Sequence, residues 1–241
     1  MGGSVNTNST LGSSNFDGSI QSTAKVNATA GFSIVTYTGT GSNGTVGHGL
    51  GVKPDSYWVK RRTGGLGDWM VFHKDLGSTK NQRLNEGLST FTQATIWNNT
   101  DPTSSVVNIG TSSAVNGNGS TYVFYAFSEV AGYSKFGSYT GNGSSDGPFV
   151  FTGFRPAFVL FKYSSGSAQW NVRDIARDTD NPTEKYLVPS TNGAEGTSSH
   201  KIDFLSNGFK HRGTGAAFNS NGGTYIYLAF AESPFKNARA R

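Results

Sequence analysis

The sequence of 241 residues contains no cysteine. A disulfide framework and a metal site built on thiolates are therefore excluded. No apolar run approaches the roughly 20 residues that cross a bilayer, so we expect no membrane insertion. Charged residues make up only 15% of the chain, and no long stretch has an apolar period of 3.6 residues. These absences argue against a fold built on long helices.

Glycine and aromatic residues are abundant instead. The chain holds 33 glycines and is 13% aromatic. Glycine supplies the positive φ that tight hairpins need, and aromatic side chains favour strands. We therefore predict an all-β chain.

Two long phrases of the sequence occur twice. TYTGTG at residue 36 recurs as SYTGNG at residue 138, and TYVFYAFSE at residue 121 recurs as TYIYLAFAE at residue 224. A period of 102 to 103 residues is the size of a domain, whereas solenoid repeats usually span 20–50 residues. The chain is thus predicted to form two tandem, internally duplicated β-sandwich domains. We expect an extended lead-in (1–30), repeat 1 (31–132), repeat 2 (133–235) and a C-terminal tail (236–241).

Strand signals fall at matching places in the two copies, each bounded by glycine or proline. The predicted strands are 32–37, 56–62, 69–73 and 121–127 in the first copy, and 133–139, 157–163, 170–175 and 224–230 in the second. Several short strands separated by turns within a hundred residues are typical of a β-sandwich.

The last strand of each copy is apolar on both faces. Successive side chains of a strand point to opposite faces, and neither set is polar here. A strand of this kind is covered on both sides. One cover is the opposing sheet, and we expect the other to be the second repeat or another subunit. The residues assigned to this packing are Tyr122, Phe124, Tyr125, Phe127, Tyr225, Tyr227 and Phe230.

The net charge of +5 raises the question of nucleic-acid binding. The one tight basic group is Lys60-Arg61-Arg62, and alternation places its side chains on both faces of a strand. An edge strand protected by charge explains this group better than a nucleic-acid site. We expect no nucleic acid among the partners.

No catalytic or metal-binding motif emerges. The histidines at 48, 73, 200 and 211 are not at metal-ligand spacing, so we expect neither a metal nor a cofactor. Asp174, Asp178, Asp180 and Glu184 crowd one segment and leave a polysaccharide depolymerase open as an alternative. Basic residues alternate with these carboxylates, which favours a charge-balanced loop. We therefore predict a non-enzymatic protein.

Sugar recognition is suggested by amides beside an aromatic ring. Trp97 is followed by Asn98 and Asn99, a combination that offers stacking and directional hydrogen bonds. The turn before the closing strand carries asparagines in both copies, which turn chemistry also explains. The candidate ligand residues are Trp97, Asn98, Asn99, Asn116, Asn118, Asn219 and Asn221.

Several phrases resemble one group of proteins. FDGSIQSTAKVNATAGFSIVTYTGTG, VGHGLGVKPD, GYSKFGSYTGNGSSDGPFVFTGFRPAFVLFK and GGTYIYLAFAESPFKNAR are similar to the C-terminal region of tail-fibre and other virion structural proteins of marine bacteriophages, including cyanobacterial phages. The resemblance runs from about Asn15 to the end of the chain. It implies a virion protein, a homotrimer, and contacts with other virion proteins.

Together these observations predict a phage tail-fibre region, distal in the fibre, that binds a bacterial surface polysaccharide for host attachment. Linked weak sites in a trimer would raise avidity by a factor of ~100 to 10,000. Two alternatives stay open at this point. One is a purely structural role as a capsid decoration or fibre connector, and the other is the depolymerase.

Overall fold

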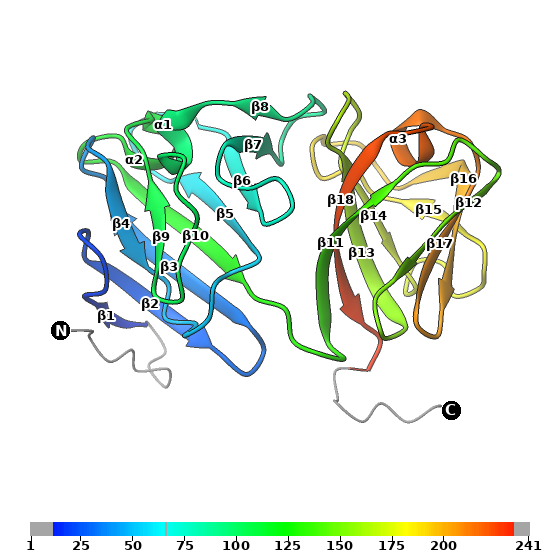
Figure 1. Cartoon of the computed structure of the whole chain (residues 1–241), viewed down its shortest axis with the longest axis horizontal. Helices are drawn as coiled ribbons and strands as arrows, with labels where there is room; N and C mark the ends of the chain where they lie inside the picture. The colour runs from blue at the N-terminus through cyan, green and yellow to red at the C-terminus, as the bar shows by residue number, and fades with distance from the viewer. Residues whose placement is uncertain (1–11, 66, 234–241) are drawn as a thin grey trace. The chain divides into compact units, whose positions relative to one another are not determined.

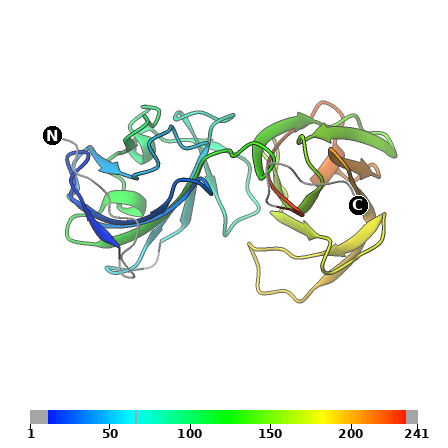
Figure 2. The ribbon, with the colours of Figure 1, turned by 90° about the horizontal axis from the view of Figure 1, so that it is seen from below.

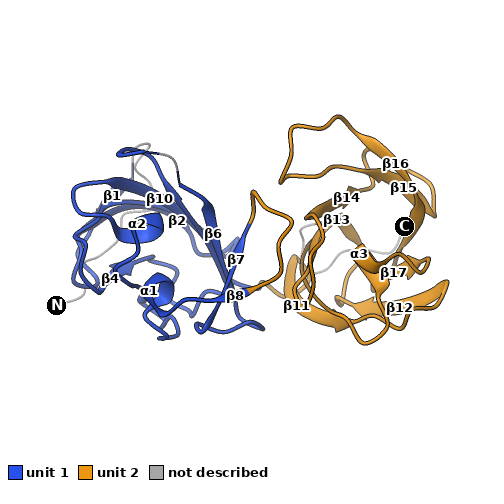
Figure 3. Ribbon diagram, turned by 90° about the horizontal axis from the view of Figure 1, so that it is seen from above, with its two compact units in different colours: residues 1–83, 91–129 blue, residues 84–90, 130–241 orange. Residues whose placement is uncertain are grey.

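The computed structural model describes residues 12–65 and 67–233, so the expected tail at 236–241 lies outside the described residues. The chain divides into two compact units (Figure 3). The first comprises residues 1–83 and 91–129, and the second comprises residues 84–90 and 130–241.

The first unit is built on one eight-stranded antiparallel sheet (Figure 1). In spatial order its strands are β1 (Ser13–Asn15), β2 (Ser22–Asn27), β3 (Phe32–Thr38), β10 (Thr121–Phe127), β5 (Ser56–Arg61), β6 (Trp69–His73), β7 (Lys80–Arg83) and β8 (Phe91–Thr92). A smaller layer holds the antiparallel pair of β4 (Gly44–Gly47) and β9 (Val106–Ile109), with the short helices α1 (Ala94–Trp97) and α2 (Ser113–Asn116).

The lead-in predicted at 1–30 is in part an integral piece of the first sheet. β2 pairs with β3 along its length, and β1 pairs with β2. Ile20 forms a bridge to Val46 of β4, and its N–H donates to the carbonyl of Thr45 (3.0 Å). Ile20, Ala24 and Val26 are buried in the core of the unit. Sequence alignment of the copies missed this segment because the second copy has no counterpart to it.

The second unit is a sandwich of two four-stranded antiparallel sheets, whose layers are visible in Figures 1 and 2. One sheet has the order β11 (Ser134–Thr140), β18 (Thr224–Ala231), β13 (Pro156–Tyr163) and β14 (Asn171–Asp174). The other has the order β12 (Asp146–Phe151), β17 (Gly208–Arg212), β16 (Gly196–Leu205) and β15 (Thr183–Tyr186). The helix α3 (Ala216–Asn219) precedes β18.

Strand order repeats between the units. β3-β10-β5-β6 in the first sheet corresponds to β11-β18-β13-β14 in the second unit, and the pair β4–β9 corresponds to β12–β17. All eight strands predicted from the sequence are present within a residue or two of their predicted bounds. The all-β fold of sandwich type is confirmed.

One strand has changed sheets between the copies. β7 and β15 are 103 residues apart, yet β7 pairs with β6 in the large sheet, whereas β15 pairs with β16 in the opposite layer and only the residue after it, Leu187, bridges to Val172 of β14. The first unit therefore has unequal layers and the second has equal ones. This difference gives the second unit an interior that differs from that of the first.

The strand carrying Lys60-Arg61-Arg62 is not an edge strand. β5 lies between β10 and β6 and pairs with both. The basic side chains are accommodated by local hydrogen bonds: Lys60 Nζ donates to the Gly67 carbonyl (2.5 Å) and Arg61 Nη2 donates to Ser120 Oγ (2.8 Å). Charge density alone is thus a poor guide to edge position in this chain.

Candidate functional site

The most faithfully duplicated part of the molecule is a turn tied by an asparagine. In the first unit, Asn116 Oδ1 accepts from the N–H of Thr40 (2.8 Å), and its Nδ2 donates to the carbonyls of Ser42 (2.6 Å) and Gly110 (2.9 Å). In the second unit, Asn219 makes the corresponding bonds to Asn142, Ser144 and Gly213 (2.7, 2.8 and 3.0 Å). We call each of these arrangements an asparagine corner.

Tyrosines complete each corner. Tyr37 donates to the Val115 carbonyl (2.5 Å), as Tyr139 donates to that of Phe218 (3.0 Å). Burial raises the pKa of both hydroxyls well above the usual value, so they keep the proton that they donate. Tyr122 and Tyr225 stack on these rings with centroids 5.1 and 4.8 Å apart.

The corners therefore correct part of the predicted ligand set. Asn116 and Asn219 are fully buried, and their amide groups are occupied by backbone partners. They hold the turn together and offer nothing to a sugar. Asn118 and Asn221, which follow them, are exposed, and their role in ligand binding stays a prediction.

Trp97 is not available for stacking on a sugar either. Its side chain is fully buried and meets Tyr57 edge-on, with ring centroids 4.9 Å apart. Asn98 and Asn99 beside it are exposed and adopt positive φ (52° and 48°), which asparagine tolerates better than most residues. The amides around Trp97 end its helix, and the ring itself belongs to the core.

The closing strands β10 and β18 place the predicted packing residues on two faces. Tyr122, Phe124, Tyr225 and Tyr227 point into the cores of their own units, so assigning them to oligomer or inter-repeat packing is wrong. Tyr125 and Phe127 lie half-buried on the opposite face of β10, and Phe230 lies half-buried on the opposite face of β18. Their contribution to an assembly stays a prediction.

The carboxylates considered for hydrolysis have local partners. Asp174 Oδ2 pairs with Arg177 Nε (2.7 Å), and Asp178 Oδ2 accepts from the backbone N–H of Glu184 (2.6 Å). Glu184 itself pairs with Lys201. Each of these three groups stabilises the loop or strand around it. No group of three or more metal-ligating side chains occurs in residues 12–65 and 67–233.

A hydroxyl-lined hollow lies on the outer face of the first sheet. Its volume is about 300 Å³, and it is lined by Gln21, Ser22, Thr23, Thr36, Tyr37, Thr38, Arg62 and Thr121. Thr23 is paired with Thr36 across β2 and β3, and Thr38 with Thr121 across β3 and β10, so their hydroxyl groups stand in two neighbouring rows. We call this the threonine hollow.

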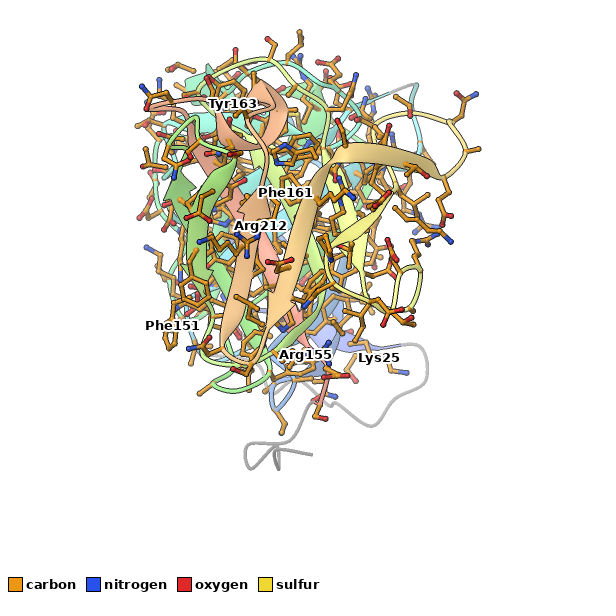
Figure 4. All side chains as sticks on the ribbon, turned by 90° about the vertical axis from the view of Figure 1, so that its right-hand side faces the viewer. Lys25, Phe151, Arg155, Phe161, Tyr163 and Arg212 are labelled. Carbon is orange, nitrogen blue, oxygen red and sulfur yellow. The ribbon has the colours of Figure 1, made fainter. Side chains whose placement is uncertain are left out.

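A second hollow of about 530 Å³ continues over the same strand pair. It is lined by Lys25, Val26, Asn27, Ala28, Thr29, Phe32 and Ile34. Lys25 is labelled in Figure 4. The two hollows together form a shallow path along β2 and β3, polar at one end and apolar at the other.

Charge on this face has one sign. β2, β3, β5 and β10 contain no aspartate or glutamate. Arg62 is exposed at the threonine hollow, where its backbone N–H donates to the Thr121 carbonyl (2.8 Å), and its guanidinium forms no salt bridge with any described residue. The face can therefore attract an anionic ligand without opposing carboxylates.

One protein-family model matches nearly the whole chain. Residues 6–234 match a domain of unknown function, DUF7483. The chain belongs to this family. Among curated proteins and among solved structures, nothing matches this DUF7483 chain.

The outer face of this DUF7483 domain was missed at the sequence level, although it left a signal there. Thr36 and Thr38 alternate with the buried Val35 and Tyr37, so they had to point outward once β3 was recognised. The absence of acidic residues from four strands was visible too. What could not be foreseen was the addition of β2, which brings Thr23 beside Thr36. Within the described residues no helix is long and apolar enough to cross a membrane.

Proposed function

We propose that this DUF7483 chain is a non-enzymatic, receptor-binding region of a phage tail fibre, and that the outer face of its first sheet binds an acidic polysaccharide of the bacterial surface. The protein would then belong to the virion, as a homotrimer in contact with other virion proteins. The resemblance to marine phage fibre proteins supports the setting, and the threonine hollow supports the binding activity.

The observation that carries the proposal is the chemistry of the threonine hollow. Sugars are recognised by groups that both donate and accept hydrogen bonds, which hydroxyl and amide side chains do. Four of the eight lining residues are threonines, and Gln21 adds an amide, whereas the Ser22 hydroxyl is buried and donates to the Gly47 carbonyl. Arg62 supplies a planar donor that fits a carboxylate or a sulfate group in two-point fashion.

The shape of the face suits an extended chain. Both hollows lie over β2 and β3, and together they present polar and apolar stretches in sequence. Open, shallow sites of this kind bind each repeat of a polymer weakly. Several copies in one assembly compensate, because linked sites raise avidity by a factor of ~100 to 10,000.

A panel of acidic and neutral bacterial polysaccharides, titrated against the full chain by calorimetry and by surface-bound arrays, tests the proposal. Arg62→Gln should weaken binding of acidic polymers at least about tenfold. Thr36→Val should weaken binding of all ligands, because it keeps the shape and removes a hydroxyl group. Thr214→Val, at an exposed residue of the second unit, and Arg155→Gln, at a half-buried arginine that pairs with Glu232, are the controls and should change binding little.

Three outcomes would count against the proposal. No binding to any polysaccharide, with antibody labelling of the capsid or of the fibre shaft, would favour the structural role. New reducing ends released from the polymer, and lost in Asp174→Ala, would favour the depolymerase. Binding that is unchanged in Arg62→Gln and Thr36→Val would place the ligand elsewhere on the molecule.

A further inference from the structure

Three basic side chains converge inside the second unit. Arg173 of β14, His200 of β16 and His211 of β17 point between the two sheets, and all three are buried. The imidazole rings have centroids 5.8 Å apart, and Arg173 Nη2 donates to the His200 carbonyl (2.8 Å). We call these three residues the basic cluster. Polar groups of this kind are rarely placed in a core without a reason.

The first unit fills the matching positions with apolar side chains. Phe72 pairs with Tyr57 in the same register in which Arg173 pairs with Val159. Trp97 ends the helix α1, whereas His200 lies on the strand β16, but Trp97 stands 103 residues before His200 and contacts Phe72 edge-on with centroids 6.3 Å apart. Ile109, buried on β9, stands 102 residues before His211, buried on β17. The basic cluster is thus a property of one copy and is not required by the fold.

Arg173 has a structural task that follows from the change of sheet by β15. Its Nη1 donates to the carbonyls of Glu184 (2.6 Å) and Lys185 (3.2 Å) of β15, and its Nε donates to Asn171 Oδ1 (3.0 Å). Arg173 thereby joins β14 of one sheet to β15 and β16 of the other. Among the described residues no carboxylate hydrogen-bonds this guanidinium, so its positive charge acts on the two imidazoles beside it.

Three of the four imidazole nitrogens lack a hydrogen-bond partner among the described residues. Nε2 of His200 and both ring nitrogens of His211 have no partner among the described residues. His200 stacks on Phe218 with centroids 4.1 Å apart, and His211 meets Phe161 edge-on at 5.3 Å. These surroundings are apolar and cannot stabilise an imidazolium.

Other ionisable groups around the cluster do not offset its charge. Tyr139 of β11 faces His211 (4.8 Å between centroids), and Tyr186 of β15 faces the guanidinium (5.2 Å). Phenols stay neutral in acid. Asp178 acts on Arg173 only at longer range, and the buried Asp203 lies on the face of β16 opposite His200, where it pairs with Arg212 (2.6 Å). Figure 4 shows Arg212 on β17 and Phe161 of the core.

We propose that the basic cluster is an acid-sensitive latch, in which protonation of His200 and His211 separates β16 and β17 from β14 and releases β15. Three cations in one apolar interior repel one another, and separating the sheets lets water reach them. The first unit holds Phe72, Trp97 and Ile109 in these places and lacks the latch. The two units then respond differently to acid: the first keeps its structure, and the second opens.

The direction of the pH dependence follows from the environment. Burial, and then the charge of Arg173, lower the pKa of His200 to about 4. Burial, then His200 and then Arg173, lower the pKa of His211 well below its usual value. Both imidazoles titrate near 6.5 in an unfolded chain, so the open state takes up protons first. The stability of the closed state is therefore complete above about pH 6.5 and falls as the pH drops toward 4. Protonation of His200 alone raises the equilibrium constant for opening about 60-fold between pH 7 and pH 4.5.

Hydrogen–deuterium exchange of the full chain, corrected for the intrinsic pH dependence of the exchange rate, tests the latch. Peptides covering residues 196–212 should show opening that rises by about 60-fold or more from pH 7 to pH 4.5. The rise should reverse on return to pH 7. His211→Ile and His200→Phe, made separately, should each remove a large part of it, since they place apolar side chains there as in the first unit.

His48→Gln is the control, because His48 is a buried histidine of the first unit. It should leave the acid response of residues 196–212 unchanged. If one histidine variant fails to fold, the other still decides the matter. The latch is refuted if opening of these strands is independent of pH, or if both histidine variants open in acid as the parent does.

Discussion

Loss of the amide of Asn219 should destabilise the second unit strongly. Asn219→Ala leaves the N–H of Asn142 and the carbonyls of Ser144 and Gly213 without the partner that the fully buried Asn219 amide supplies. A backbone group left unpaired costs about 1–3 kcal/mol where it is buried, and water at the exposed residues Asn142 and Ser144 recovers part of the sum. We expect a loss of about 3–5 kcal/mol in the free energy of unfolding. Domain stabilities are about 5–15 kcal/mol, so this change brings the unit near its limit.

Urea unfolding followed by tryptophan fluorescence measures the effect. Trp170 is the one tryptophan of the second unit, whereas the other three belong to the first. Unfolding of the two units therefore contributes differently to the change in fluorescence. Asn116→Ala should produce a loss of similar size in the first unit. Asn221→Ala, two residues from Asn219 and exposed, is the matched control and should change stability by less than about 0.5 kcal/mol.

A small effect would refute this reasoning. If Asn219→Ala costs less than about 1 kcal/mol, water or a rearranged turn replaces the amide, and the corner is not what holds the unit together. The asparagines would then become available again as candidates for ligand contact.

Three further predictions concern single substitutions. Trp97→Ala should cost about 3–5 kcal/mol through the cavity it leaves, and in the fraction that stays folded it should leave polysaccharide binding intact, as denaturation and binding titrations will show. Gly141→Ala should cost about 3 kcal/mol or more, because the new Cβ would lie 2.2 Å from the Ser220 carbonyl oxygen, whereas thermal unfolding of Gly193→Ala should match the parent within about 1 kcal/mol. Lys53→Ala breaks an exposed ion pair of 2.8 Å and should lower stability by less than about 1 kcal/mol in the same assay.

Duplication made much of this fold predictable from sequence. Because two similar segments encode each of these strands, the bounds of the strand are predicted twice. A misplaced bound in one copy can therefore be corrected from the other copy. The closing strands illustrate this, since both were placed to the residue or nearly so. Their central position in a sheet, between β3 and β5 or between β11 and β13, satisfies the backbone on both edges. It does not cover the outer face, where Tyr125 and Phe127 lie half-buried.

Whatever differs between the copies escaped prediction. The strands β1 and β2 have no second version to compare with, and the change of partner between β7 and β15 depends on contacts far apart in the sequence. Arg173 illustrates the difficulty. It looks like one basic residue among several in a polar segment, and only the path of β15 explains why it is buried.

The candidate site was harder to predict for a related reason. Tryptophan and asparagine occur in sugar-binding sites and also in cores and turns. The sequence around Trp97 and Asn116 does not distinguish these two uses. Burial decides between them. The threonine hollow depends on register across β2, β3 and β10, which no local pattern reveals.

The strand pair β1–β2 has a consequence for how domains of this kind are delimited. Alignment of the two copies stops near residue 31, but Ile20, Ala24 and Val26 line the first interior. A protein trimmed at the point where the copies cease to match would lose one wall of its first half and expose Val35 and Val46 to water. Similarity between the two copies therefore marks the start of the duplicated segment. The folded first unit begins further upstream, because it includes β2, which pairs with β3.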